Sequence, residues 1–304
     1  MTHAPHVYCA ETARTNHEPL LATASIADLW LLVECPTPWA PDALRDSRHL
    51  GDAAKRHLFD AMEAFEGLRV QLIQRASSVG AERSFFVAVP DARAPALYRV
   101  PFPDDEALAR LDLALFARRD PSVEALRTDR PIGLVCTHGR HDPCCARYGA
   151  ALYRALRDHP GVEVWQSTHV GGDRFAANLV CLPDGLYFGH LDEAAGRAAL
   201  DTYAAGRVDA SHYRGRCTHG RFEQAAECLV RLAGGPSGAR DLTLRSCTGG
   251  GETRVVTFVD AAGAAHVATV RRVKDGRRAL LTCASNRPEA LVTFALDDYR
   301  RETR

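Results

Sequence analysis

The stretch PIGLVCTHGRHDPCCARYGAALYRALRDHPGVEVWQSTH, residues 131–169, predicts the fold class of the chain. It opens with a short, mostly apolar run that ends in a cysteine, which is typical of a buried strand. Asp142-Pro143 is the capping and first-turn pair of a helix, which we expect over about 143–158. The apolar run at 162–167 predicts a second strand. A strand, a helix and a strand in this order indicate an α/β protein.

The same order of elements occurs earlier in the chain. LLVEC (31–35) matches GLVC (133–136) at an offset of 101 residues, VPD (89–91) matches LPD (182–184), and LYRVPF (97–102) matches LYFGHL (186–191). We expect an extended segment over 22–35, strands over 68–74, 84–89, 97–102, 131–136, 162–167, 177–182 and 186–191, and helices over 51–66, 104–113, 143–158, 192–205 and 222–232. Each copy then has the order β-α-β-β-β-α, which is that of a thioredoxin-type half-sheet with helices packed on it.

Breaks in composition divide the chain into four segments. The run GGPSG at 234–238 is a breaker, and the sequence beyond it alternates with period two in TRVVTFV, HVATVRRV, RALLTC and ALVTFAL. We expect an N-terminal tail over 1–19, a degenerate thioredoxin-like half over 20–125, a second thioredoxin-like half over 126–235, and a small antiparallel β module over 236–304. Cys247 and Cys283 are predicted on different strands of this module, as core residues.

Composition excludes several classes of protein. The 304 residues include 38 basic and 38 acidic side chains, so the chain lacks the excess positive charge of an unspecialised nucleic-acid binder. No apolar run approaches the roughly 20 residues of a membrane helix, and the first residues lack the pattern of a signal peptide. We therefore expect a cytoplasmic protein that binds neither nucleic acid nor membrane, with its ten cysteines reduced.

Three cysteines and two histidines crowd into residues 136–145. Cys144 and Cys145 fall in the first turn of the predicted helix, where free N–H groups favour thiolates. Adjacent helical residues point about 100° apart, so the two cysteines are not expected to face one centre. Cys145 shares a stripe with Leu152 and Leu156 and is aimed at the sheet, which makes it the expected partner of Cys136.

The second strand of the stretch ends in THVGGDRF, residues 168–175. If the two strands are parallel, His169 and Asp173 lie at the same edge of the sheet as Cys136. The resulting pattern is Cys-x8-Cys-x23-His-x3-Asp. Structural zinc sites usually show shorter spacings between cysteines. Ligands on two separate loops suit a two-metal group such as a [2Fe–2S] cluster, although core thiols beside a turn would give the same pattern.

CTHGRHDPCCARYG and STHVGGDRFAANLVCLPDGLYFG resemble the two signature blocks of the sucrase/ferredoxin-like family, the thioredoxin-like ferredoxins. The resemblance spans roughly residues 20–235. It implies a [2Fe–2S] cluster held by Cys136, Cys145 and His169 in the second half. Cys35 occupies the position equivalent to Cys136 in the first half, but no second thiol follows it, so we expect no cluster there. The family has a second histidine where this chain has Asp173. Either Asp173 is the fourth ligand, or Cys144, His138 or His141 replaces it, or the cluster is absent.

The resemblance implies an electron-transfer protein that works with a reductase or acceptor protein. Two alternatives stay open: a thiol-disulfide or peroxide oxidoreductase that uses Cys136 with Cys144 or Cys145, and a zinc-stabilised binding module. The absence of a C-x-x-C motif counts against the first. Cys217 opens CTHGR (217–221), an exact repeat of residues 136–140, but no second thiol follows it. Paired carboxylates that would suggest glycoside hydrolysis are not apparent.

Overall fold

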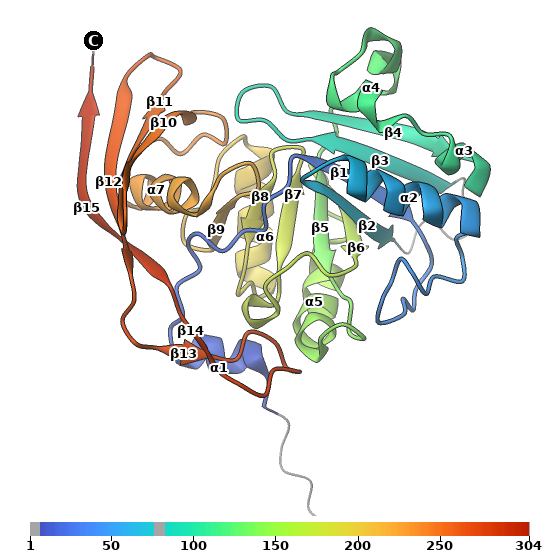
Figure 1. The fold of residues 1–304 in the computed structure, drawn as a ribbon, viewed down its shortest axis with the longest axis horizontal. Coiled ribbons are helices and arrows are strands. Elements are labelled where there is room, and N and C mark those ends of the chain that lie inside the picture. The colour runs from blue at the N-terminus through green and yellow to red at the C-terminus, as the bar shows by residue number, and fades with distance from the viewer. Residues whose placement is uncertain (1–6, 76–82, 304) are drawn as a thin grey trace, which may run out of the picture.

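The computed structural model describes residues 7–75 and 83–303 (Figure 1). A nine-stranded mixed sheet, ordered β4-β3-β1-β2-β6-β5-β7-β8-β9, forms the body of the protein, and a separate four-stranded antiparallel sheet is ordered β10-β11-β12-β15. The strands of the large sheet are β1 (Leu29–Glu34), β2 (Leu68–Gln74), β3 (Arg83–Val89), β4 (Ala96–Phe102), β5 (Ile132–Cys136), β6 (Glu163–Ser167), β7 (Leu179–Leu182), β8 (Leu186–Phe188) and β9 (Tyr213–Arg216). The expected α/β class and the small antiparallel sheet after residue 236 are confirmed.

The two copies expected from the sequence have the same strand arrangement. The first is ordered β2-β1-β3-β4 and the second β6-β5-β7-β8. In each copy the first two strands are parallel, the third runs antiparallel to the first, and the fourth runs antiparallel to the third. Because β5 and β6 are parallel and Cys136 lies opposite Ser167, the loops that follow them emerge at one edge of the sheet.

The large sheet folds over at the junction of the two copies. Only the pairs Ile73–Ser167 and Gln74–Gln166 join β2 to β6. Five sheet steps separate Trp30 on β1 from Tyr187 on β8, which would be roughly 24 Å in a flat sheet. Their ring centroids are instead 6.2 Å apart. The two half-sheets therefore face each other across a shared apolar layer.

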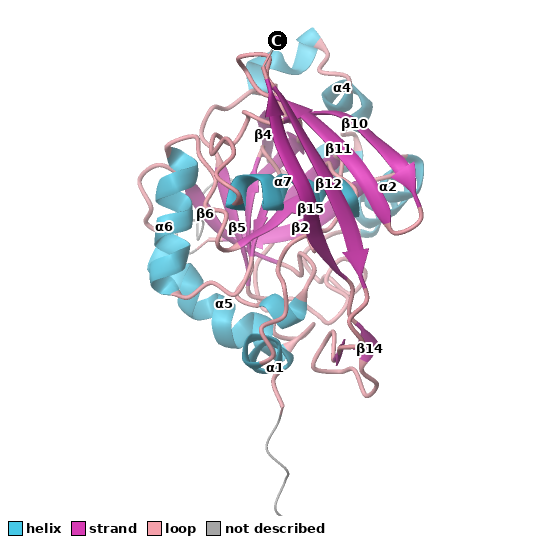
Figure 2. Ribbon diagram, turned by 90° about the vertical axis from the view of Figure 1, so that its left-hand side faces the viewer, coloured by secondary structure: helices cyan, strands magenta, loops and turns pink. Residues whose placement is uncertain are grey.

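Helices cover the outer faces of the two half-sheets. The helices are α1 (Cys9–Thr15), α2 (Asp52–Ala64), α3 (Asp105–Ala109), α4 (Leu113–Ala117), α5 (Pro143–Leu156), α6 (Glu193–Ala204) and α7 (Arg221–Leu232), with 3-10 turns at Pro121–Leu126 and Asp173–Phe175. Leu58 of α2 packs in the core of the first half. Leu152 of α5 and Leu200 of α6 pack in the core of the second half, and both helices lie outside the sheet (Figure 2).

Helix α7 lies between the large sheet and the C-terminal sheet (Figure 1). The C-terminal strands are β10 (Thr243–Gly250), β11 (Thr253–Val259), β12 (Ala265–Val273), β13 (Arg278–Ala279), β14 (Glu289–Ala290) and β15 (Thr293–Glu302). Ala226 and Val230 of α7 share an apolar core with Val256, Phe258 and Val270. The helix thus packs directly on the β module that follows it.

The helix expected over 104–113 begins where it is expected, but its end is wrong, because α3 stops at Ala109 and a second short helix, α4, follows. Asp104 caps α3, and Asp112 caps α4 by accepting a hydrogen bond from the Ala114 amide. A side chain that competes for the backbone in this way ends one helix and starts another.

The strand expected through Cys283 is also wrong. Only Arg278–Ala279 of that stretch is extended, and Cys283 lies in a turn, half-buried, rather than on a core strand.

The N-terminal tail contains α1, which lies beside β13 and β14 although they come from opposite ends of the chain (Figure 1). Residues 1–6 of the expected tail lie outside the described residues. No helix in the described ranges has the length and apolarity needed to cross a membrane.

Glu227 of α7 provides a test of this packing. It is fully buried, and its carboxylate binds Arg216 at 3.2 Å, Arg231 at 2.9 Å and the Tyr213 hydroxyl at 3.0 Å. Burial by itself would raise the pKa of Glu227, but the two guanidinium groups outweigh it and hold the pKa well below its usual range. We expect Glu227→Gln to lower the free energy of unfolding by about 3–5 kcal/mol at pH 7, because it leaves two buried cations uncompensated.

A depressed folded-state pKa stabilises the protein above the unfolded-state pKa of about 4.3, and the gain is lost as the pH falls below that value. In denaturant unfolding, the difference in free energy of unfolding between wild type and Glu227→Gln should therefore become smaller below about pH 4.3. Glu252→Gln is the matched control, since Glu252 also pairs with two cations but is exposed. If Glu227→Gln and Glu252→Gln lower the free energy of unfolding equally, the buried ion pairs of α7 do not stabilise the protein as described.

Candidate metal centre

Cys136 and Cys145 meet where β5 ends and α5 begins. The Asp142 carboxylate caps α5 by accepting a hydrogen bond of 2.8 Å from the Cys144 amide. This starts the helix directly above the end of β5. Gly149 brings the two elements close together, because a Cβ atom on it would lie 1.9 Å from the Cys136 carbonyl oxygen. Cys145 consequently packs in the same apolar layer as Cys136.

The donors expected from the sequence are brought together. The Sγ atoms of Cys136 and Cys145 and a ring nitrogen of His169 lie within 4.8 Å of one another. His169 Nδ1 is 2.9 Å from Asp173 Oδ1 and 3.9 Å from Cys145 Sγ. The Cys145 thiol also lies 3.4 Å from Asp173 Oδ1.

Of the three alternate donors, only His141 joins this group. Its ring stacks on that of His169 with centroids 3.9 Å apart, and its Nε2 lies 3.8 Å from Asp173 Oδ2. His138 Nε2 bonds the Ala40 carbonyl instead. Cys144 points to the opposite side of α5, as the 100° step between adjacent helical residues predicts.

The potential ligands form two overlapping groups. Cys136, Cys145 and His169 make the first, and His141, His169 and Asp173 make the second. His169 belongs to both. The arrangement therefore offers two soft thiols on one side and harder nitrogen and oxygen donors on the other.

The pKa values of the two thiols are shifted in opposite directions. A hydrogen bond from Cys145 lowers the pKa of Cys136 well below its usual value, against the effect of burial, and His169 adds to this. The same hydrogen bond, together with burial, raises the pKa of Cys145. Of the two thiols, Cys136 is therefore the more acidic, and the thiolate is the form that binds metal.

Burial and neighbouring charges also shift the pKa values of the two histidines and of Asp173. Burial disfavours the charged form of His169, but Asp173 and Cys136 outweigh it and raise its pKa to about 9. Burial and the charge of His169 lower the pKa of His141, so that ring is neutral at pH 7. Burial opposes ionisation of Asp173, but His169 keeps its pKa low and the carboxylate charged.

A buried arginine holds the histidine loop in place. Arg214 of β9 donates hydrogen bonds to the Gly171 carbonyl (2.9 Å) and to Asn178 Oδ1 (2.8 Å). Gly172 has a φ of 83°, and a Cβ on it would lie 2.3 Å from Arg214 Nη2, so glycine is required there. No sequence pattern singles out Arg214, because β9 is short and flanked by polar residues.

The first copy supplies one wall of the site. The rings of Trp39 and His138 are nearly perpendicular, with their centroids 5.9 Å apart. Thr168 accepts a hydrogen bond from the Leu72 amide and donates one to Gln71, both on β2. The loop that carries His169 is thus anchored to both halves.

Other cysteines considered from the sequence stand apart from these donors. Cys217 is buried in the apolar layer, and burial raises its pKa to about 12. Cys35 contacts the Ser47 hydroxyl at 3.6 Å. Neither belongs to a potential metal-binding group among the residues that the structure describes.

Comparison with known proteins gives one match. The sequence profile of the sucrase/ferredoxin-like family matches residues 20–215, well over half of the chain. That range contains all the donors described above. Comparison with curated proteins and with solved structures found no match.

The close approach of α5 to β5 can be tested with Gly149→Ala. Helix propensity alone predicts that alanine stabilises a helix by about 0.8–1.0 kcal/mol relative to glycine. The contact with the Cys136 carbonyl predicts the opposite sign, a loss of about 1–3 kcal/mol, because a backbone atom must shift. Denaturant unfolding of the metal-free protein measures the difference. Gly250→Ala is the control, since a Cβ there meets nothing within 4 Å. A Gly149→Ala variant more stable than wild type would contradict the packing described.

Proposed function

The chain belongs to the sucrase/ferredoxin-like family, and from this premise we propose that it is an electron carrier with one [2Fe–2S] cluster. Cys136 and Cys145 would bind one iron, and His169 and Asp173 the other. The observation that carries the proposal is the pair of overlapping donor groups that share His169. When bound, such a cluster takes up and releases one electron at a time.

The division of the donors favours two metals over one. A structural zinc ion needs four donors around a single point, whereas Asp173 groups with the two histidines rather than with both cysteines. Histidines replace two thiolates on one iron in some [2Fe–2S] centres, so a mixed set of ligands is compatible with this cluster type. The residues present therefore fit the group.

The architecture supports the same proposal. The two copies share one strand order and one set of strand directions, which supports the proposal that each is a thioredoxin-type half-sheet. We propose that residues 126–235 form the ferredoxin half, that residues 20–125 form a degenerate half that carries no cluster and serves as a wall, and that residues 236–304 form a third module. The ten free cysteines suit a reducing compartment, so we propose the cytoplasm as its location.

Electrons would enter and leave on the histidine side. The Cys136 and Cys145 side chains are buried, whereas the side chains of His169 and His141 are 21% and 39% exposed. A redox partner protein would therefore approach the stacked histidine rings. The same burial argues against a thiol-disulfide enzyme, because a substrate disulfide could not reach Cys136.

Iron content and colour test the cysteine ligands. Protein purified without oxygen should contain about two iron and two sulfide per chain and show iron–sulfur absorption bands. Cys136→Ser and Cys145→Ser should each abolish the colour, because each removes a thiolate from the same iron. Cys217→Ser is the control and should keep it. Reactive thiols without colour would favour the oxidoreductase, and zinc lost with Cys136→Ser would favour the zinc module.

The reduction potential tests Asp173. A carboxylate keeps a negative charge and favours ferric iron, whereas a neutral imidazole brings less negative charge. We expect Asp173→His to retain the cluster and raise the potential by on the order of 100 mV. His141→Ala should leave the potential nearly unchanged. If His141→Ala instead loses the cluster and Asp173→Ala has no effect, the fourth ligand is His141.

A further inference from the structure

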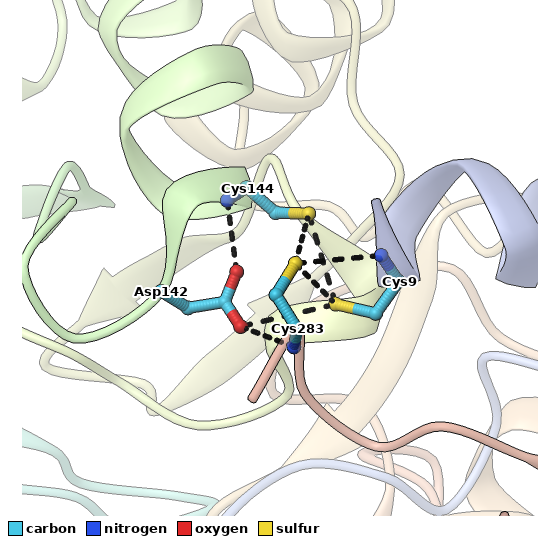
Figure 3. Close-up of side chains that lie close together, drawn as sticks. All are labelled: Cys9, Asp142, Cys144 and Cys283. Carbon is cyan, nitrogen blue, oxygen red and sulfur yellow. Dashed lines mark hydrogen bonds between the residues drawn. The ribbon is translucent and has the colours of Figure 1, made fainter. Parts of the chain in front are cut away.

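A second group of donors lies on the other side of the first turn of α5. It comprises Cys9 of α1, Cys144 of α5 and Cys283 of the C-terminal turn, which three distant parts of the chain bring together (Figure 3). The Sγ–Sγ distances are 3.7 Å for Cys9–Cys144, 3.3 Å for Cys144–Cys283 and 3.6 Å for Cys283–Cys9. The three sulfurs thus form a nearly equilateral triangle.

Asp142 completes this group. Its Oδ1 accepts the capping hydrogen bond from the Cys144 amide at 2.8 Å, and its Oδ2 accepts one from the Cys283 amide at 2.7 Å. Oδ2 also lies 3.9 Å from Cys9 Sγ. All four residues offer a ligand atom within 4.8 Å of the others (Figure 3). The carboxylate therefore faces the triangle of sulfurs, fixed by two backbone amides.

We propose that Cys9, Cys144, Cys283 and Asp142 bind one Zn²⁺ ion. Zinc binds cysteine sulfur at about 2.3 Å in a tetrahedron, which sets neighbouring sulfurs roughly 3.8 Å apart. The observed distances are within about half an ångström of that value. Small outward movements of the side chains would admit the ion.

The kind of donor favours zinc over other metals. Three thiolates exclude magnesium and calcium, which take oxygen ligands. The carboxylate is a hard donor that copper(I) does not select. All four donors converge in one group, unlike the two overlapping groups around His169, so a single ion fits better than a two-iron cluster. A divalent cation would also offset the mutual repulsion of buried thiolates.

This site is separate from the proposed cluster. Cys144 and Cys145 are neighbours, but they lie about 100° apart around the helix and face different groups. Cys9 and Cys283 lie outside residues 20–215, the range that matches the family. The zinc ion would tie α1 and the turn that holds Cys283 to the start of α5, and Figure 1 shows α1 beside β13 and β14.

Zinc and iron contents of the full-length protein test the proposal. Wild type should carry about one zinc per chain, and Cys9→Ser/Cys283→Ser should lose it while keeping its iron and colour. Cys136→Ser/Cys145→Ser should show the reverse pattern. Cys247→Ser is the control, because Cys247 lies in the same C-terminal module outside the group. Zinc that remains in Cys9→Ser/Cys283→Ser overturns the proposal, as does copper in place of zinc.

Cobalt substitution tests the zinc site if Cys9→Ser/Cys283→Ser does not fold. Reduced, metal-depleted protein carrying Cys136→Ser/Cys145→Ser should bind one Co²⁺ and develop thiolate-to-cobalt absorption. Zinc should displace that cobalt. A protein that develops no such absorption overturns the proposal, whatever the iron content of wild type. If wild-type protein contains no iron but the variant still develops the cobalt absorption, the [2Fe–2S] cluster is contradicted and the zinc site is not.

Discussion

The carboxylate of Asp142 is the constraint on which both candidate metal sites depend. One oxygen caps α5 and so fixes where the helix starts above the end of β5. The other holds the backbone of Cys283 and faces Cys9. Because the helix starts at this point, its first turn presents Cys145 to Cys136 and Cys144 to Cys9 and Cys283. A single capping interaction thereby assigns two adjacent cysteines to two different groups.

The folded sheet explains why the candidate centre around Cys136 and His169 depends on both halves of the large sheet. The half-sheets face each other, and the loop after β6 bonds to β2 of the first copy through Thr168. Trp39 and Ala40 of the first copy contact His138. The first copy has no second thiol after Cys35, yet it buries the thiol side of the centre and leaves the histidine side open. The first half of the sheet thus covers the two thiols, while the two histidines remain partly exposed.

The sequence predicted most strands and the donors of the first site because those features are local. Apolar runs gave the strands, and Asp142-Pro143 gave the start of α5. Contacts between residues that are distant in the chain have no comparable local pattern in the sequence. The sharp fold between β2 and β6 depends on two residue pairs, and Arg214 acts from a strand of only four residues. The alternating neighbours of Cys283 predict a strand there, whereas its partners are 274 and 139 residues away in the chain.

A crystal structure of the purified protein, with anomalous difference maps at the iron and zinc absorption edges, would locate both metals. We expect iron peaks between the Cys136–Cys145 pair and the His169–Asp173 pair. We also expect one zinc peak enclosed by Cys9, Cys144, Cys283 and Asp142. Zinc beside Cys136, or a single metal position that uses both Cys144 and Cys145, would contradict these assignments.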